Sequence, residues 1–216
     1  MTRTPLDPAH IIPNEAALRA LFPPVHAIAA IKSLPGLDPH ARDFIARAPF
    51  VCLGTQGADG RADVSPRGDA PGFVQVLDDR TLALPDRPGN NRLDSLANII
   101  GNPQVGLLFM IPGFEETLRV NGTAQLTTDP DLLALGRMDD RDPRLMVVIH
   151  VAEVFVHCAK AFRRSGLWDP AKRQDRGAMP SLMQMLHDQT AERPLDAAEL
   201  AEKDAQLEEA YQKTLY

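Results

Sequence analysis

The hydrophobic pattern changes twice along the chain. Over residues 1–47, apolar residues recur at helical spacing in short pieces, which Pro23-Pro24 and Pro35-Gly36 interrupt. From Phe50 the apolar runs become short and are separated by hairpin signals such as Asp59-Gly60. Near the C-terminus a helical pattern returns. The pattern therefore predicts a β-rich domain between two helical extensions, with the divisions 1–47, 48–170 and 171–216.

Six or seven short strands are predicted in the middle of the chain. Their apolar runs are Phe50–Thr55, Ala62–Ser65, Phe73–Leu77, Thr81–Leu84, Val105–Ile111, Thr117–Thr127 and Met146–Cys158. Two short helices interrupt them, one over Leu93–Ile100 and one over Asp131–Met138. Many short strands joined by hairpins, with few helices between them, favour an antiparallel barrel over a doubly wound parallel sheet.

The C-terminal extension is expected to end in an amphipathic helix. Asp196 and Glu199 have the spacing of a capping pair. An apolar stripe follows at helical spacing, formed by Leu200, Leu207, Tyr211 and Leu215. The stripe has to pack on something, either the same barrel or a partner subunit.

Charge and cysteine content narrow the function classes. The net charge of −6 argues against nucleic acid as the main partner. Cys52 and Cys158 lie in apolar runs without metal-ligand spacing, which favours two buried free thiols over a disulfide. The chain start lacks a leader pattern and no apolar run approaches a membrane span, so the expected location is cytoplasmic. A small anionic ligand is indicated by arginines clustered in mid-chain: Arg61, Arg67, Arg80, Arg87 and Arg92.

The segment Pro85–Arg92 is a candidate phosphate site between a strand and a helix. A helix start offers unpaired N–H groups, and Arg87 and Arg92 add forked cationic donors. Gly89 permits close backbone approach, and Asn90 or Asn91 can cap the helix or donate a hydrogen bond. The alternative is a solvated turn in which the arginines pair with nearby carboxylates, namely Asp86 and Asp94.

A second candidate segment runs from Val64 to Asp69. Pro66 cannot donate to a strand ladder, so it marks a strand end or a sheet edge, where a ligand could take the place of a neighbouring strand. Arg67 and Gly68 would then present a cation beside accessible backbone. An ordinary exit from strand to loop explains the same residues.

Two further segments leave their roles open. Leu118–Ala124 alternates as a half-buried strand does; Gly122 suggests a bulge, and Arg119 could reach a ligand or a surface carboxylate. The tryptophan, Trp168, follows Arg163 and Arg164, so it could stack on a planar anion or form a hydrophobic lid.

The chain offers few groups for acid–base or covalent chemistry of its own. His150 and His157 are seven residues apart and fall on opposite faces of a regular strand, which makes them a poor metal pair. No metalloprotease helix motif and no serine nucleophile elbow occurs. We therefore expect no metal site, assign no catalytic residue, and expect a cofactor to carry any reaction.

Taken together, these segments resemble the pyridoxamine-phosphate-oxidase-like flavoproteins over roughly residues 45–170. The resemblance is closest to a subgroup of probable FMN-dependent proteins of unsettled substrate. It implies a six-stranded FMN-binding split β-barrel that forms a homodimer with FMN at the interface. The stretches that carry it are DVSPRGDAPGF, LALPDRPGNNRLDSLANIIGNPQVGLLF, ETLRVNGTAQL and HCAKAFRRSGLW.

The resemblance also implies a set of cofactor-binding residues. Those along the flavin ring would be Ser65, Pro66, Arg67 and Gly68, and those at the phosphate would be Arg87, Asn90, Asn91 and Arg92. From the other subunit, the ring would be reached by Pro112, Gly113, Glu116 and Leu118, with Arg164 and Trp168 bordering the site.

Two departures from the family pattern bear on function. The sequence after Trp168, DPAKRQDRGAMPSL, lacks the basic signature that grips the substrate phosphate, and Leu93 stands where a second cation could follow Arg92. Both argue against vitamin B6 oxidation. The expected function is an FMN-dependent oxidoreductase that transfers hydride through flavin N5 to or from a small molecule not identified by the sequence. The alternative is a non-catalytic flavin or tetrapyrrole binder for storage, sensing or transfer.

Overall fold

The computed structural model describes residues 6–191 and 193–215, and the chain divides between Ser33 and Leu34 into two compact units. The first unit contains a short 3-10 helix at Pro8–His10 and two five-residue helices, α1 (Glu15–Arg19) and α2 (Ala27–Ile31). None of its described residues is buried.

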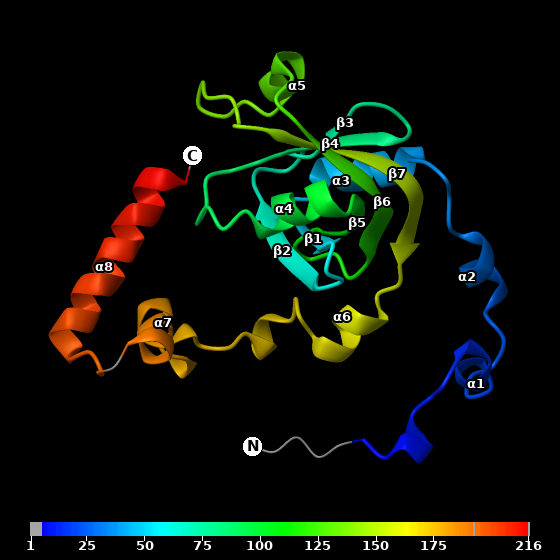
Figure 1. Ribbon diagram of the computed structural model, residues 1–216, viewed down its shortest axis with the longest axis horizontal. Helices are drawn as coiled ribbons and strands as arrows, with labels where there is room; N and C mark the ends of the chain where they lie inside the picture. The colour runs from blue at the N-terminus through cyan, green and yellow to red at the C-terminus, as the bar shows by residue number, and fades with distance from the viewer. Residues whose placement is uncertain (1–5, 192, 216) are drawn as a thin grey trace. The chain divides into compact units, whose positions relative to one another are not determined.

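The second unit is built on one antiparallel sheet in the order β2-β1-β5-β6-β7-β4-β3 (Figure 1). The mainly β, antiparallel architecture is confirmed, but the expected count of six strands is wrong. The short strand β3 is the seventh, and it pairs with β4 at one end of the sheet. Because β2 and β3 lie at opposite ends of the order, the sheet is not closed. The strands are β1 (Phe50–Gln56), β2 (Ala62–Gly68), β3 (Gln75–Val76), β4 (Thr81–Pro85), β5 (Gln104–Met110), β6 (Thr117–Thr127) and β7 (Met146–His157).

Helices flank the sheet. Two of them have buried residues: α3 (Pro39–Arg47) and α4 (Asp94–Gly101). In the last helix, the Asp196 side chain accepts hydrogen bonds from the backbone of Ala198 and Glu199, so the predicted capping pair is confirmed. The remaining helices are α5 (Pro130–Leu135), α6 (Lys160–Ser165), α7 (Leu182–Thr190) and α8 (Ala197–Thr214), with short 3-10 turns at Pro170–Lys172 and Arg176–Ala178. Among the described residues, no helix is long and apolar enough to cross a membrane.

The hydrophobic core lies between the sheet, α3 and α4. Alternate residues of β1 are buried, as expected for a strand with one face on the core. The helix α3 adds Ala41 and Ile45, and α4 adds Leu96 and Ile99. Two side-chain hydrogen bonds fasten α4 to the sheet, from Ser95 to Asp63 and from Asn98 to Thr55. The position of α4 fixes where the preceding loop can lie.

Some local predictions are wrong. Pro66 does not end its strand, because β2 continues through Pro66, opposite Cys52, to Gly68. The alternative interpretation of Pro66, as a residue at a sheet edge, is confirmed, because β2 is an edge strand and tolerates a missing N–H donor. Cys52 and Cys158 are free thiols as expected, but Cys158 is exposed and Cys52 only partly buried.

The predicted bulge at Gly122 is confirmed. The register between β6 and β7 shifts between Asn121, which pairs with Glu153, and Gly122, which pairs with Val151. A Cβ at Gly122 would overlap the carbonyl oxygen of His150 and lie 3.0 Å from its carbonyl carbon. Only glycine therefore allows the two longest strands of the sheet to approach here.

We expect Gly122→Ala to lower the free energy of unfolding by about 3 kcal/mol, because backbone atoms of β7 have to move. Urea denaturation measures the change. Gly89→Ala is the matched control: a Cβ there would meet nothing closer than the Arg87 carbonyl oxygen at 4.0 Å. Equal losses in the two variants would contradict the assignment of close packing to Gly122.

Candidate functional site

The two arginine-bearing segments of the sequence meet at one cavity of about 640 Å³, here called the β2 pocket. The edge strand β2 forms one wall, the loop from Pro85 to Leu93 with the first turn of α4 forms another, and Phe73 also lines the cavity. Along β2 the half-buried positions alternate at Asp63, Ser65 and Arg67. The pocket brings together eight of the predicted site residues: Ser65, Pro66, Arg67, Gly68, Arg87, Asn90, Asn91 and Arg92.

Arg87 is held on two sides by groups of its own chain. Its Nε donates to Asp69 Oδ2 at 2.6 Å, and its Nη1 donates to the Gly136 carbonyl oxygen at 2.6 Å. The Asp69 side chain is 0% exposed and the Arg87 side chain 18% exposed, so this is a largely buried ion pair. Arg87 therefore ties the loop after β4 to the end of β2 and to the end of α5.

Arg67 has a donor that nothing in the structure satisfies. Its Nη1 donates to Asp86 Oδ1 at 3.1 Å, and both side chains are about one-fifth exposed at 20% and 18%. The Nε atom of Arg67 is buried and has no hydrogen-bond partner among the described residues. Because buried N–H groups in proteins are nearly always paired, this atom indicates a position for a ligand acceptor.

Arg92 lies at the solvent side of the pocket. Its side chain is 74% exposed, and its Nε donates to Asp94 Oδ2 at 2.8 Å. Of the two carboxylate pairings considered for this turn, the one with Asp94 is confirmed. The carboxylate of Asp86 pairs instead with Arg67 from β2.

The start of α4 differs from the predicted cap. Neither Asn90 nor Asn91 caps the helix, because the helix begins later, at Asp94, with Leu93 as its N-cap and no side-chain capping bond. The Asn90 side chain instead accepts from the backbone N–H of Arg92. Asn91 and Leu93 adopt left-handed φ values of 56° and 60°. For leucine this conformation is unfavourable by about 1–2 kcal/mol, so the loop is held in a strained shape.

The charges of the β2 pocket nearly cancel. Each of its three arginines pairs with a carboxylate, and a further carboxylate, Asp63, accepts from the Ser95 hydroxyl. The pocket therefore has little excess positive charge. What it offers a ligand is N–H donors that are not used within the chain. Guanidinium groups retain such donors, since each carries five N–H bonds.

The other predicted site residues do not line this pocket. They lie around the turn between β5 and β6 and around α6 and the turn that follows it: Pro112, Gly113, Glu116, Leu118, Arg164 and Trp168. Trp168 Nε1 donates to the Phe114 carbonyl oxygen at 2.7 Å, and its ring centroid is 5.7 Å from that of Phe162. The Leu118 side chain is fully buried in the core.

Two arginines outside the β2 pocket, Arg163 of α6 and Arg119 of β6, contact other residues of the chain. The Glu115 carboxylate, 2.6 Å from Arg163, raises the pKa of that guanidinium above its ordinary value. Among the described residues, Arg119 pairs with no carboxylate and does not line the β2 pocket; its guanidinium lies 5.0 Å from the centroid of the Phe155 ring. Among the residues that the structure describes, no three potential metal ligands gather at one place.

The family model of pyridoxamine 5'-phosphate oxidase matches residues 37–158, which is more than half of the chain. The chain belongs to this family. The match covers all the strands of the sheet and every residue that lines the β2 pocket. The resemblance inferred from the sequence is thereby confirmed, and the β2 pocket is a pocket of the pyridoxamine 5'-phosphate oxidase family domain.

Solved structures similar to this family member share low identity. HupZ of Group A Streptococcus is 23% identical over 56% of this chain and 93% of that chain, with a TM-score of 0.45. A putative pyridoxamine 5'-phosphate oxidase of Lactobacillus delbrueckii is 24% identical over 58% and 99%, also at 0.45. HutZ of Vibrio cholerae, described as a heme storage protein, is 17% identical over 56% and 94%, at 0.38. No curated protein matches the chain.

Sequence reasoning did not name Asp69 as a partner of Arg87, and it paired Asp86 with the arginines of its own turn, whereas the structure pairs it with Arg67. Asp69 and Asp86 stand in the same segments as the predicted cations, so their carboxylates were a usable signal, but spacing did not say which arginine each would meet. Gly136 carries no signal at all, because its contribution is a backbone carbonyl from a residue 49 positions away from Arg87.

We expect Asp69→Asn to lower the free energy of unfolding by about 3 kcal/mol, because the largely buried Arg87 charge loses its partner. Chemical denaturation at neutral pH measures this. Asp43→Asn is the control, since Asp43 pairs with Arg47 at 2.9 Å while both side chains are more than 60% exposed. Because both side chains are exposed to solvent, that pair should contribute little to stability. If Asp69→Asn lowers the free energy of unfolding no more than Asp43→Asn does, the contacts of Arg87 with Asp69 and Gly136, here called the Arg87 clamp, have no structural role.

Proposed function

We propose that this protein is an FMN-dependent oxidoreductase that binds the flavin in the β2 pocket. The observation that carries the proposal is the buried, unpartnered Nε of Arg67 in a pocket lined by the residues that the family resemblance assigns to flavin. A flavin carbonyl or phosphate oxygen would satisfy this donor. Membership of a family that typically binds flavin supports the same cofactor.

The residues present fit FMN. The cavity of about 640 Å³ is within the range of about 300–1,000 Å³ found for small-molecule sites. Arg67 and Arg87 are oriented by Asp86 and Asp69, and each keeps N–H groups for ligand oxygens. The strained backbone from Asn91 to Leu93 adds N–H groups ahead of α4.

Each part of the pocket has a distinct task in this proposal. Ser65 and Arg67 on β2 hydrogen-bond the polar edge of the ring, and Arg87 and Arg92 hold the phosphate at the loop. Asp69 and Asp86 position the two inner arginines. Bound flavin supplies hydride transfer at N5, and the chain's residues orient it and exclude water.

A second copy of the chain is expected to complete the site. The turn between β5 and β6 and the segment around Trp168 do not line the β2 pocket of their own chain. In a homodimer they would border the partner's flavin, which is the role the family resemblance gives them. Leu118 is left out of this set, because its side chain is buried within its own core.

A non-catalytic flavin or tetrapyrrole binder is the second candidate. One observation favours it: no histidine, lysine, cysteine or tyrosine is among the residues lining the β2 pocket. The pocket thus has no side chain whose ordinary pKa lies between those of the carboxylates and arginine. Hydride transfer needs no such group, but turnover of a substrate that must gain or lose a proton does.

We expect Arg67→Lys to weaken FMN binding about tenfold to a hundredfold, because lysine keeps a charge for Asp86 but has no Nε–H; such a contact contributes about 1.5–3 kcal/mol. Quenching of FMN fluorescence on titration gives the dissociation constant. Arg92→Gln should have a smaller effect because that side chain is exposed. Arg61→Gln, outside the pocket, is the control. Wild-type affinity in Arg67→Lys would contradict the site.

Turnover separates the two candidate functions. With dissolved oxygen as the terminal electron acceptor, we expect the FMN-loaded protein to oxidise NADH, NADPH or reduced deazaflavin catalytically. Activity lost in Arg67→Lys should be restored in part by excess FMN. Absorbance of the donor under multiple-turnover conditions measures the rate. Tight flavin binding with no turnover of any of these donors would favour the binding role.

A further inference from the structure

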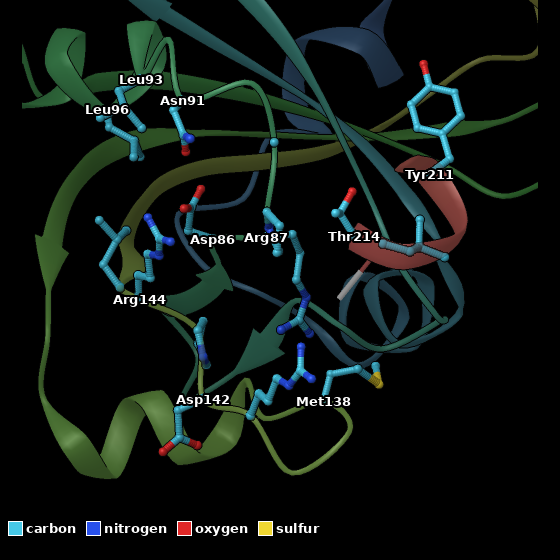
Figure 2. Close-up of a pocket in the computed structure, with 16 residues that line it drawn as sticks. Asp86, Arg87, Asn91, Leu93, Leu96, Met138, Asp142, Arg144, Tyr211 and Thr214 are labelled. Carbon is cyan, nitrogen blue, oxygen red and sulfur yellow. The ribbon is translucent and has the colours of Figure 1, made fainter. Parts of the chain in front are cut away.

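A second cavity of about 840 Å³, here called the α8 pocket, adjoins the loop that lines the β2 pocket. The two cavities share residues 86–89, 91, 93 and 96, so the loop after β4 forms part of the wall of each. The α8 pocket extends from there to the segment 141–145 and to the last turn of α8 (Figure 2). The proposed flavin function does not use it.

Apolar side chains dominate the walls of the α8 pocket. Figure 2 shows Leu93 and Leu96 on one side of the view, with Tyr211 and Thr214 of α8 on the other. Tyr211 is 50% exposed and Leu215 is 65% exposed, although both line the cavity. A ligand with an apolar body would cover these side chains and remove their surface from water.

The charges at the α8 pocket do not cancel as they do in the β2 pocket. Its two carboxylates, Asp86 and Asp142, are paired with arginines that do not line it, Arg67 and Arg137. The Arg137 hydrogen bonds, at 2.8 and 3.1 Å, lower the pKa of Asp142 below its ordinary value. Both acids are therefore already compensated from outside the cavity.

Arg144 remains as an uncompensated cation of this pocket. It lines the cavity, and its side chain has neither a hydrogen bond nor an ion pair within the described part of the chain. The other two arginines of the lining have partners: Arg87 is fixed by Asp69 and Gly136, and Arg141 has an interaction of its own within the chain. A single unpaired guanidinium beside an apolar cavity matches a ligand with one acidic group and an apolar body.

We propose that the α8 pocket is a second binding site, which takes a small amphipathic anion, with the acidic group at Arg144 and the apolar body against Leu93, Leu96 and the Tyr211 ring of α8. The site is separate from the proposed flavin site and does not depend on the flavin proposal. The shared loop, held by Arg87, is the wall through which the two sites adjoin.

Matched ligands test the proposal. Equilibrium dialysis of the full-length protein, with FMN in excess, compares naphthoate with naphthalenemethanol, which has the same ring without the charge. We expect naphthoate to bind more tightly. Arg144→Gln should weaken naphthoate about tenfold and leave naphthalenemethanol unchanged, because it removes only the charge-assisted contact. Tyr211→Ala should weaken both ligands, because it removes apolar wall.

The controls locate the effect. Arg173→Gln removes an exposed arginine outside the cavity and should change neither ligand. Octanoate as a competitor identifies the body that the site prefers: displacement of naphthoate indicates an acyl chain, and no displacement indicates a planar ring. The proposal is overturned if Arg144→Gln retains the preference for naphthoate or if Arg173→Gln loses it equally. FMN affinity, measured separately in Arg144→Gln, should equal that of the wild type, which distinguishes a change at the α8 pocket from a change at the β2 pocket.

Discussion

The geometry of both cavities depends on the contacts that the Arg87 guanidinium makes with Asp69 and Gly136. The guanidinium joins Asp69, just after β2, to the Gly136 carbonyl at the end of α5, and it does so from the loop that both cavities share. Removing one partner of a largely buried ion pair is costly because it leaves the other charge desolvated and unpaired. The loop after β4 is therefore fixed at its first residues by electrostatics, with little help from hydrophobic burial.

The same pairing changes how anion recognition by this fold should be understood. Five arginines close together in the sequence suggest a strongly positive patch, yet in the β2 pocket every arginine has a carboxylate partner. Selectivity there comes from directed N–H donors, such as Arg67 Nε, in a nearly neutral site. Binding of this kind depends on donor geometry more than on ionic strength, since neutralised pairs exert little long-range field.

The sequence predicted the long antiparallel strands, but it predicted neither the strand count of the sheet nor the contacts of Arg87. Alternation, hairpin pairs and the Gly122 bulge predicted the long strands and their order along the chain, because these signals are local. Pro66 left a strand end and a sheet edge open, because both have the same local signal, and only the sheet order shows that β2 is an edge strand. The Asp69–Arg87 and Asp86–Arg67 pairs join residues 18 and 19 positions apart across different elements, so no periodicity encodes them.

Backbone strain gives a last argument that the loop is shaped for a ligand. Leu93 has a φ of 60° and is 55% exposed, so neither its conformation nor its burial stabilises this position. Three contacts on either side of the loop offset that cost. They are the ion pair of Arg87 with Asp69, the hydrogen bond from the Asp86 N–H to the Leu145 carbonyl, and the hydrogen bond from Ser95 of α4 to Asp63. Residues kept in unfavourable φ/ψ regions tend to lie at binding sites, where the strained shape is the one a ligand needs. Leu93 lines both cavities, so the strained residue, the clamp and the two proposed sites are parts of one local structure.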